Sequence, residues 1–207
     1  MFPLNVPNVL TVLRILLVPV LVVALTSEID NGDTIAAIVF ALASLTDGLD
    51  GYIARSRKSI TTFGKVMDPI ADKMLITAAL IALVSLHRLA AWVAMVIVAR
   101  EFAVSSLRVA AAAEGAIIPA SILGKIKTVI QIAAVMALII ADDPSATWVD
   151  FLVGLMVVAT IASGVDYFLN VRREIDGARE RHAQRTAARS GVETSRSSSS
   201  SREVPRI

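Results

Sequence analysis

Four aspartates in two short stretches are the residues of this sequence best suited to chemistry. Asp47 and Asp50 are three residues apart and Asp68 and Asp72 are four apart, so each pair falls on one face of a helix. All four lie in or near apolar stretches, where a carboxylate costs about 2.5–3.5 kcal/mol at the centre of a membrane helix. They therefore require a polar cavity, a cation, or both.

The residue types around these acids indicate which cation and which chemistry. Converging carboxylates repel one another in a low-dielectric site, and oxygen ligands favour hard ions, so the pattern predicts Mg²⁺ or Mn²⁺. The absence of cysteine excludes thiolate ligands and cysteine nucleophiles. Gly51 and Ala54 leave room for a bulky ligand, and the planar fork of Arg55 suits phosphate oxygens. Together these features predict phosphoryl transfer.

The elements that must position these residues are membrane helices. Hydrophobic residues make up 56% of the 207-residue chain and charged residues only 18%, which is typical of a membrane protein. A spanning helix needs about 20 mostly apolar residues. We therefore expect an all-α integral membrane protein with six transmembrane helices. The expected helices are Val9–Thr26, Thr34–Ala54, Pro69–Leu86, Ala90–Ala113, Ile122–Ala141 and Trp148–Val171.

The charges of the connecting segments predict the orientation of these helices. Residues 55–65, 125–127 and 172–173 are rich in Lys and Arg, whereas residues 28–33 and 142–144 are acidic. The positive-inside rule then places both termini in the cytoplasm, with Arg88 as the one exception. The second and third helices form a hairpin with a cytoplasmic turn. Both acid pairs therefore lie near one membrane boundary, in a polar, metal-containing cavity open to the cytoplasm.

The chain divides into a membrane domain over residues 1–171 and a polar tail over residues 172–207. The tail is rich in Arg and Ser, so we expect a short surface helix to about residue 189 and disorder beyond it. Its arginines are either solvated or in contact with anionic lipid headgroups. The net charge of +2 is too small to indicate a nucleic-acid partner.

The acids belong to a longer pattern of fixed residues. The sequence resembles the CDP-alcohol phosphatidyltransferase family, whose signature is D-x2-D-G-x2-A-R-x8-G-x3-D-x3-D. The signature residues here are Asp47, Asp50, Gly51, Ala54, Arg55, Gly64, Asp68 and Asp72. The resemblance extends to about residue 171 and implies the six-helix fold of the family.

The resemblance also implies roles for these residues. The four aspartates would hold two Mg²⁺ or Mn²⁺ ions, and Asp72 would also be the general base for the acceptor hydroxyl. It implies a homodimer among membrane lipids in the inner (plasma) membrane, with the active site facing the cytoplasm. The residues implied to bind CDP-diacylglycerol are Asn8, Thr11, Arg14, Asp50, Gly51, Ala54, Arg55 and Gly64.

A second group of charges predicts the acceptor. Four cations of the fourth and fifth predicted helices are suited to a second anion: Arg100, Arg108, Lys125 and Lys127. A phosphorylated acceptor would satisfy them better than serine or free inositol. Further stretches resemble family members that use sn-glycerol 3-phosphate, which implies phosphatidylglycerophosphate and CMP as products.

Plainer interpretations of single residues stay open at this point. Asp68 could cap a helix that begins at Pro69, and Asn8 could cap the first helix. Gly64 could be an ordinary loop glycine. Among the cations, Lys125 and Lys127 could be membrane anchors, Arg100 could form a buried structural pair with Glu101, and Arg108 could reach the membrane interface.

Other functions also stay open. A family member that uses phosphatidylglycerol or another acceptor is the nearest alternative. A cation-coupled transporter is more remote, because the polar residues cluster toward one membrane face and a transport path needs polar access from both.

Overall fold

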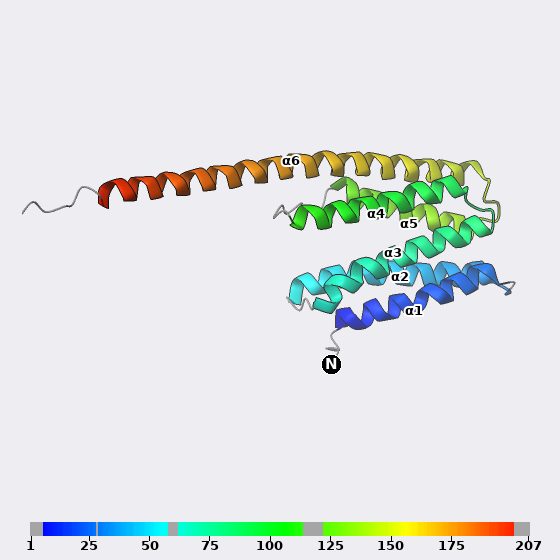
Figure 1. Cartoon of the computed structure of the whole chain (residues 1–207). Coiled ribbons are helices and arrows are strands. Elements are labelled where there is room, and N and C mark those ends of the chain that lie inside the picture. Colours follow the sequence, from blue (N-terminus) through cyan, green and yellow to red (C-terminus); the bar gives the residue numbers. More distant parts are fainter. Residues whose placement is uncertain (1–5, 28, 58–61, 114–121, 201–207) are drawn as a thin grey trace, which may run out of the picture.

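The computed structural model describes residues 6–27, 29–57, 62–113 and 122–200, with side chains over residues 9–27, 29–46, 70–71, 73–113 and 122–174. Within these ranges the chain forms six helices and no strand, which confirms the all-α class (Figure 1). The helices are α1 (Val6–Thr26), α2 (Gly32–Arg57), α3 (Thr62–Ser85), α4 (Ala91–Ala113), α5 (Ile122–Ile140) and α6 (Thr147–Ser200).

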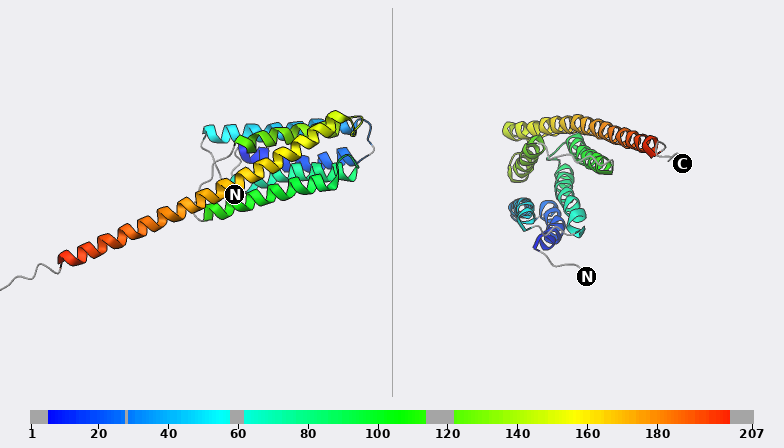
Figure 2. Two further views of the ribbon diagram at one scale, coloured as in Figure 1. Left: turned by 90° about the horizontal axis from the view of Figure 1, so that it is seen from above. Right: turned by 90° about the vertical axis from the view of Figure 1, so that its left-hand side faces the viewer.

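The helices run up and down, so successive connections alternate between the two ends of the bundle (Figure 1). We call one end the α1–α2 end; it also carries the α3–α4 and α5–α6 connections. The opposite, α2–α3 end holds the start of α1, the end of α4 and the start of α5. Helix α1 packs against α2 and α3, while α6 packs against α4 and α5. Contacts of α2 with α5 and of α3 with α4 join the two groups (Figure 2).

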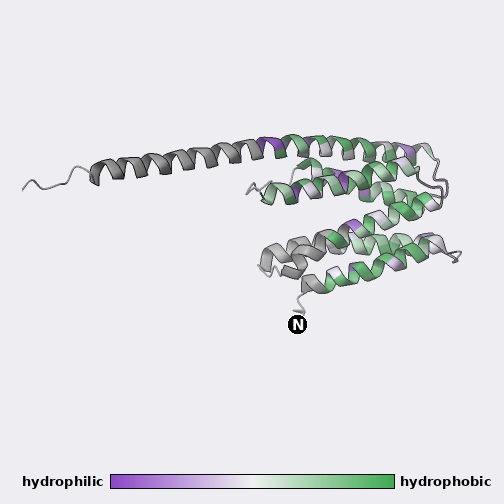
Figure 3. Ribbon diagram, in the orientation of Figure 1, coloured by the Kyte–Doolittle hydropathy of each residue, from purple (hydrophilic) through white to green (hydrophobic). Residues whose placement is uncertain are grey.

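Apolar side chains lie both inside and outside this bundle. Leu21, Phe40 and Leu138 are among the fully buried core residues. Large apolar side chains also cover the outside; Ile122 is 74% exposed and Phe151 is 69% exposed. Figure 3 shows hydrophobic residues along most of the described ribbon. An apolar exterior of this extent marks a surface that faces lipid rather than water.

Three helical segments of the described chain are long and apolar enough to cross a membrane. They are Val9–Thr26, Ile122–Ile140 and Thr147–Glu174. Shorter apolar helical stretches cover Gly32–Thr46 and Lys73–Ser85. Helix α4 carries Arg100, Glu101 and Arg108 within its length, so it is less apolar than these three. The chain therefore has the helices of a membrane protein.

Two capping alternatives are wrong, because both helices begin earlier than the sequence suggested. Helix α3 starts at Thr62, so Asp68 lies inside the helix and Gly64 is not a loop residue. Helix α1 starts at Val6, which makes Asn8 an internal residue. Pro69 falls within α3 because membrane helices tolerate proline where neighbouring groups satisfy the freed carbonyl.

The last helix also differs from the expected tail. Helix α6 continues without interruption from Thr147 to Ser200, past the boundary expected at residue 172 and past the expected disorder beyond residue 189. Much of this extension consists of Arg, Glu, Ala and Gln, which are good helix formers. Because it continues an existing helix, no new nucleation step is needed. The division into a membrane domain and a tail stays a prediction.

The turn after α3 is closed by a residue in a left-handed conformation. His87 has a φ of 57°. The Arg88 N–H donates to the Leu83 carbonyl at 2.9 Å and the His87 N–H donates to the Val84 carbonyl at 3.0 Å. This pair of bonds is the Schellman motif that ends many helices, usually with glycine at the position of His87.

The same turn explains why Arg88 departs from the positive-inside rule. Its Nη2 donates to Asp33 Oδ2 at 2.6 Å, on the neighbouring α1–α2 connection. Its Nη1 donates to the Ile139 carbonyl at 3.0 Å, in the last turn of α5. A cation at a helix C-terminus is stabilised by the carbonyls there. Arg88 is thus held at the α1–α2 end by structural partners.

Candidate active site

The four signature aspartates lie on helices that meet at the α2–α3 end. Asp50 lies seven residues before the end of α2, and Asp68 lies six residues after the start of α3. At 1.5 Å per residue these positions are about 10 Å and about 9 Å from the helix ends, and therefore at a similar depth. The side chains of Asp47, Asp50, Asp68 and Asp72 lie outside the described residues, so their convergence stays a prediction.

Of the remaining residues expected near the nucleotide, only some have side chains that the structure describes. Thr11 and Arg14 of α1 are buried, each with 1% of its surface exposed, and both lie in the half of α1 nearer the α2–α3 end. Burial of an arginine in this half of the bundle fits a polar interior at the depth of the acids. The side chains of Asn8, Gly51, Ala54, Arg55 and Gly64 lie outside the described residues.

The four cations expected to bind an acceptor phosphate line one cavity of about 420 Å³. Arg100 and Arg108 come from α4, and Lys125 and Lys127 come from α5. Lys73 of α3 joins them, so five cations line the cavity, against Glu101 as the one acid among its described lining residues. An excess of positive charge in a half-buried cavity favours an anionic ligand.

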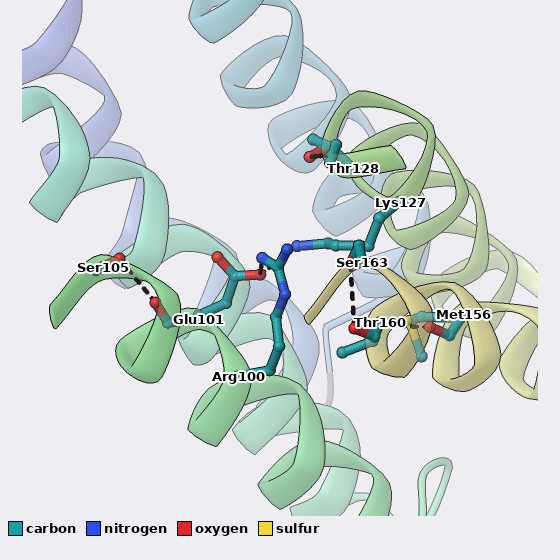
Figure 4. A network of polar contacts seen from close by, with 9 residues as sticks. Arg100, Glu101, Ser105, Lys127, Thr128, Met156, Thr160 and Ser163 are labelled. Atoms are coloured by element: carbon teal, nitrogen blue, oxygen red, sulfur yellow. Dashed lines mark hydrogen bonds and ion pairs between the residues drawn. The ribbon is translucent and has the colours of Figure 1, made fainter. Parts of the chain in front are cut away.

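Glu101 holds two of these cations together. Arg100 Nη1 donates to Glu101 Oε1 at 3.2 Å, and Lys127 Nζ donates to the same oxygen. Figure 4 shows the three side chains converging from α4 and α5. Only 5% of the Lys127 side chain and 15% of the Arg100 side chain are exposed, so both charges are largely withdrawn from solvent. One carboxylate shared by two cations leaves positive charge available to a ligand.

Helix α6 completes the wall of this cavity. Tyr167 and Ser163, four residues apart on α6, both line it. The Arg108 guanidinium lies 5.7 Å from the centroid of the Tyr167 ring, within the range of a cation–π contact. The Ser163 hydroxyl donates to the Thr160 carbonyl at 3.1 Å, within its own helix. Arg108 is thus held toward the cavity by an aromatic ring.

A glycine on α6 makes room for Arg100. A Cβ atom added to Gly164 would lie 3.3 Å from Arg100 Cγ, a closer approach than most side chains tolerate. The absence of a side chain at this position lets the arginine stem pass between α4 and α6. Gly154, ten residues earlier on the same helix, has no such neighbour within 4 Å.

A smaller cavity of about 110 Å³ adjoins the large one. The two cavities share Lys73, Glu101, Lys127 and Thr128. Beyond these residues the small cavity is lined by Ser44 of α2, Gln131 of α5 and three apolar side chains. Neither Gln131 nor Ser44 was among the site residues predicted from the sequence.

Three further cavity residues were not predicted from the sequence. The four-residue spacing of Ser163 and Tyr167, which places two polar residues on one face of an apolar helix, was the available signal for that pair. Lys73 directly follows Asp72, and this adjacency to the acid pair was the available signal. Among the described side chains, no group of three or more His, Cys, Asp or Glu residues could hold a metal ion. The predicted carboxylate ligands lie outside that set.

The helical architecture and the signature together define the class of this protein. A model of the CDP-alcohol phosphatidyltransferase family matches residues 4–164. The chain therefore belongs to this family, which confirms the resemblance carried by the aspartate pattern.

Individual relatives are similar over most of their length. The chain is 41% identical over 180 residues to the CDP-diacylglycerol–glycerol-3-phosphate 3-phosphatidyltransferase of Bacillus subtilis (strain 168), an alignment that covers 79% of this chain and 93% of that protein. It is 38% identical over 169 residues to the protein of the same name from Rickettsia felis, covering 79% of this chain and 93% of the relative. A probable phosphatidylglycerophosphate synthase of Mycobacterium tuberculosis (strain H37Rv) is 38% identical over 180 residues, covering 85% and 86%.

Proposed function

We propose that this protein transfers the phosphatidyl group of CDP-diacylglycerol to sn-glycerol 3-phosphate, which gives phosphatidylglycerophosphate and CMP. Membership of the family supports the donor and the type of reaction. The names of relatives that are 38–41% identical support the acceptor. The activity belongs to phospholipid biosynthesis in a membrane.

The observation that carries this proposal is the cation-lined cavity. Lys73, Arg100, Arg108, Lys125 and Lys127 from three helices surround a space of about 420 Å³. Two anionic groups must be accommodated in the reaction: the diphosphate of the donor at the acids and the phosphate of the acceptor elsewhere. An acceptor without a phosphate would leave the cavity with an excess of positive charge, because Glu101 is the one acid among its described lining residues, and such an excess is costly in a partly buried site. The cavity therefore favours a phosphorylated acceptor.

The carboxylates fit a pair of divalent cations in their chemistry and in their position. Oxygen donors are the ligands that Mg²⁺ and Mn²⁺ prefer, and the two acid-bearing helix segments lie at a similar depth at one end of the bundle. Asp47, Asp50, Asp68 and Asp72 are the residues that would hold the ions. Bound there, the ions would supply charge neutralisation for the diphosphate of the donor.

The chain's own residues perform the remaining tasks. Arg100 and Lys127, held by Glu101, orient the acceptor phosphate. Asp72 accepts the proton of the acceptor's primary hydroxyl, whose oxygen attacks the lipid-side phosphorus of CDP-diacylglycerol. The new P–O bond forms as the bond to CMP breaks, and CMP leaves with the electron pair. Holding both reactants at the bundle end turns the transfer into a step within one complex.

Residues near the start of the chain and in the signature would bind the nucleotide end of the donor. Thr11 and Arg14 are buried on α1 at the depth of the acids. Gly51 and Ala54 leave space on α2, and Arg55 is suited to the diphosphate. Asn8, Asp50 and Gly64 complete the proposed set.

We place this site on the cytoplasmic face of the inner (plasma) membrane. All six helices would cross the membrane, with both termini and the α2–α3 end in the cytoplasm. The basic connections lie at that end, and Arg88, the exception, is held by Asp33 and the end of α5 at the other. The working unit would be a homodimer.

The test is an acceptor screen with the purified protein in detergent–lipid micelles. CMP release from CDP-diacylglycerol is measured with Mg²⁺ or Mn²⁺ and with sn-glycerol 3-phosphate, phosphatidylglycerol, inositol phosphate or serine. We expect release that depends on metal and on sn-glycerol 3-phosphate. Release with phosphatidylglycerol alone would instead identify a cardiolipin synthase, and metal-stimulated uptake into liposomes without CMP would identify a transporter.

A further inference from the structure

Two residues that line the small cavity each have a buried polar atom without a hydrogen-bond partner in the described structure. These atoms are the Gln131 amide nitrogen Nε2 and the Ser44 hydroxyl oxygen Oγ. Only 2% of the surface of Gln131 is exposed. A buried donor without a partner costs roughly 1–3 kcal/mol, so such groups usually bond to a ligand or to ordered water. Two of them on one cavity indicate a polar ligand group there.

The position of the small cavity relates it to the reaction. Ser44 is three residues before Asp47 on α2, and Lys73 directly follows Asp72 on α3. On its other side the cavity meets the large, cation-lined cavity at Glu101, Lys127 and Thr128. It therefore adjoins both the acid-bearing helix segments and the cations proposed to bind the acceptor phosphate.

The middle of an acceptor bound at both places would lie next to the small cavity. Its phosphate would be bound at Arg100 and Lys127, and its reacting hydroxyl would be at Asp72. In sn-glycerol 3-phosphate, the carbon between these two groups carries a second hydroxyl. The cavity of about 110 Å³ is large enough for a group of this size, and its polar lining comes from uncharged as well as charged side chains. An amide donor and a serine hydroxyl are suited to a neutral hydroxyl.

We propose that Gln131 and Ser44 bind the secondary hydroxyl of the acceptor and make the enzyme selective for a polyol phosphate over a simple hydroxyalkyl phosphate. The hydroxyl accepts a hydrogen bond from Gln131 Nε2 and exchanges one with Ser44 Oγ. This inference rests on the proposed function and adds a selectivity site to it. A site built to bond a substrate hydroxyl rejects an analogue that lacks it, because the site's own polar groups are then left unpaired.

The experiment compares two acceptors that differ by one hydroxyl. CMP release by the full-length protein is measured with sn-glycerol 3-phosphate and with 3-hydroxypropyl phosphate, which lacks the secondary hydroxyl. For the wild type we expect kcat/KM to favour sn-glycerol 3-phosphate by roughly 10- to 100-fold. In Gln131→Leu this preference should fall to about threefold or less, with activity on the deoxy analogue retained.

Two further variants separate selectivity from general damage. Ser44→Ala should reduce the preference in part and gives the answer by itself if Gln131→Leu does not fold. Ser85→Ala is its matched control, because the Ser85 hydroxyl donates to the Ala82 carbonyl near the α1–α2 end and faces neither cavity. This control should keep the wild-type preference.

The outcomes are distinguishable. A wild-type enzyme that uses both acceptors equally well overturns the inference, and so do active Gln131 and Ser44 variants that keep the full preference. In both cases the proposed function stands, because CMP is still released with sn-glycerol 3-phosphate. No release from the wild type with that acceptor would overturn the proposed function itself.

Discussion

Two partly buried arginines, one at the α1–α2 end of the bundle and one near the middle of α4, have opposite surroundings. The Arg88 side chain is 22% exposed and that of Arg100 is 15% exposed, so burial alone does not separate them. Arg88 bonds to Asp33 and to carbonyls at the end of α5. Arg100 shares one carboxylate oxygen with Lys127, and its buried Nε has no hydrogen-bond partner in the described structure.

The difference teaches how a buried charge reveals its role. At the α1–α2 end, acceptors of the protein itself surround the cation, and the result is a closed structural contact. Between the middle of the bundle and the α2–α3 end, five cations line a cavity beside one described acid. A cation whose charge is neutralised by acceptors of the protein itself stabilises the fold. An excess of cations beside a cavity instead indicates a site for an anionic ligand. The predictions below test this distinction from the largest expected effect to the smallest.

The largest effect should come from the proposed base at the α2–α3 end. Asp72→Asn keeps the size of the side chain but cannot accept the acceptor's proton. We expect CMP release to fall by about 10²–10⁴-fold, the usual contribution of a positioned base. Thermal unfolding should confirm that the variant folds. A wild-type rate in a folded variant would remove Asp72 from this role.

The cations of the large cavity should act on the acceptor alone. Arg100→Ala and Lys127→Ala each remove a charged donor, so we expect the KM for sn-glycerol 3-phosphate to rise by roughly 10- to 100-fold. The KM for CDP-diacylglycerol should change little. Steady-state kinetics with each substrate varied in turn provides the measurement. A rise confined to CDP-diacylglycerol would contradict the assignment of the cavity.

For Arg88 we expect the opposite of the cavity cations: a change in stability and no change in substrate binding. Arg88→Ala removes the ion pair with Asp33 and the bonds to the end of α5, so it should lower stability and leave both KM values unchanged. The loss should be about 1 kcal/mol, because the Asp33 side chain is 44% exposed and water screens the pair. Thermal unfolding in micelles measures it, and Asp33→Asn should cost less because the carbonyl bonds persist. A changed acceptor KM would break the comparison between the two ends.

The sequence predicted the helices well because the bilayer constrains them strongly. Long apolar stretches must form helices in lipid, so the expected ranges agree with α1, α2, α4 and α5 to within a few residues. Helix starts were less predictable. Pro69 suggested a first turn, yet α3 begins at Thr62. A proline in the sequence does not show whether the helix begins at that residue or several residues before it.

The residues of the candidate site could likewise be predicted only in part from the sequence. Arg100, Arg108, Lys125 and Lys127 were predicted together from charge within apolar helices, and the structure brings them to one cavity. Ser44, Tyr167 and Gln131 could not be assigned from sequence, because serine, tyrosine and glutamine in membrane helices often serve packing alone. Their importance follows from tertiary position: which cavity a side chain faces, and whether a partner satisfies it.

Two glycines of α6 provide a smaller test of how Arg100 is positioned. In Gly164→Ala the new methyl group would press on Arg100 Cγ at 3.3 Å, so the guanidinium must shift. We expect the acceptor KM to rise by about 3- to 10-fold, less than for removal of the charge. Gly154→Ala is the matched control, since nothing lies within 4 Å of its added Cβ. Equal effects of both changes would indicate a general response of α6 rather than displacement of Arg100.

The smallest effect belongs to the turn that presents Arg88. His87 has a φ of 57°, a conformation that glycine adopts without the steric cost of a Cβ atom. His87→Gly should therefore raise the free energy of unfolding by about 0.5–1 kcal/mol, since the larger entropy of glycine in the unfolded chain offsets part of the relief. His87→Ala keeps the Cβ atom and should bring no gain. Because the imidazole is exposed and lies at the far end from both cavities, neither variant should alter a KM value. A stabilised His87→Gly enzyme with wild-type kinetics would show that strain at the α1–α2 end is independent of catalysis at the other.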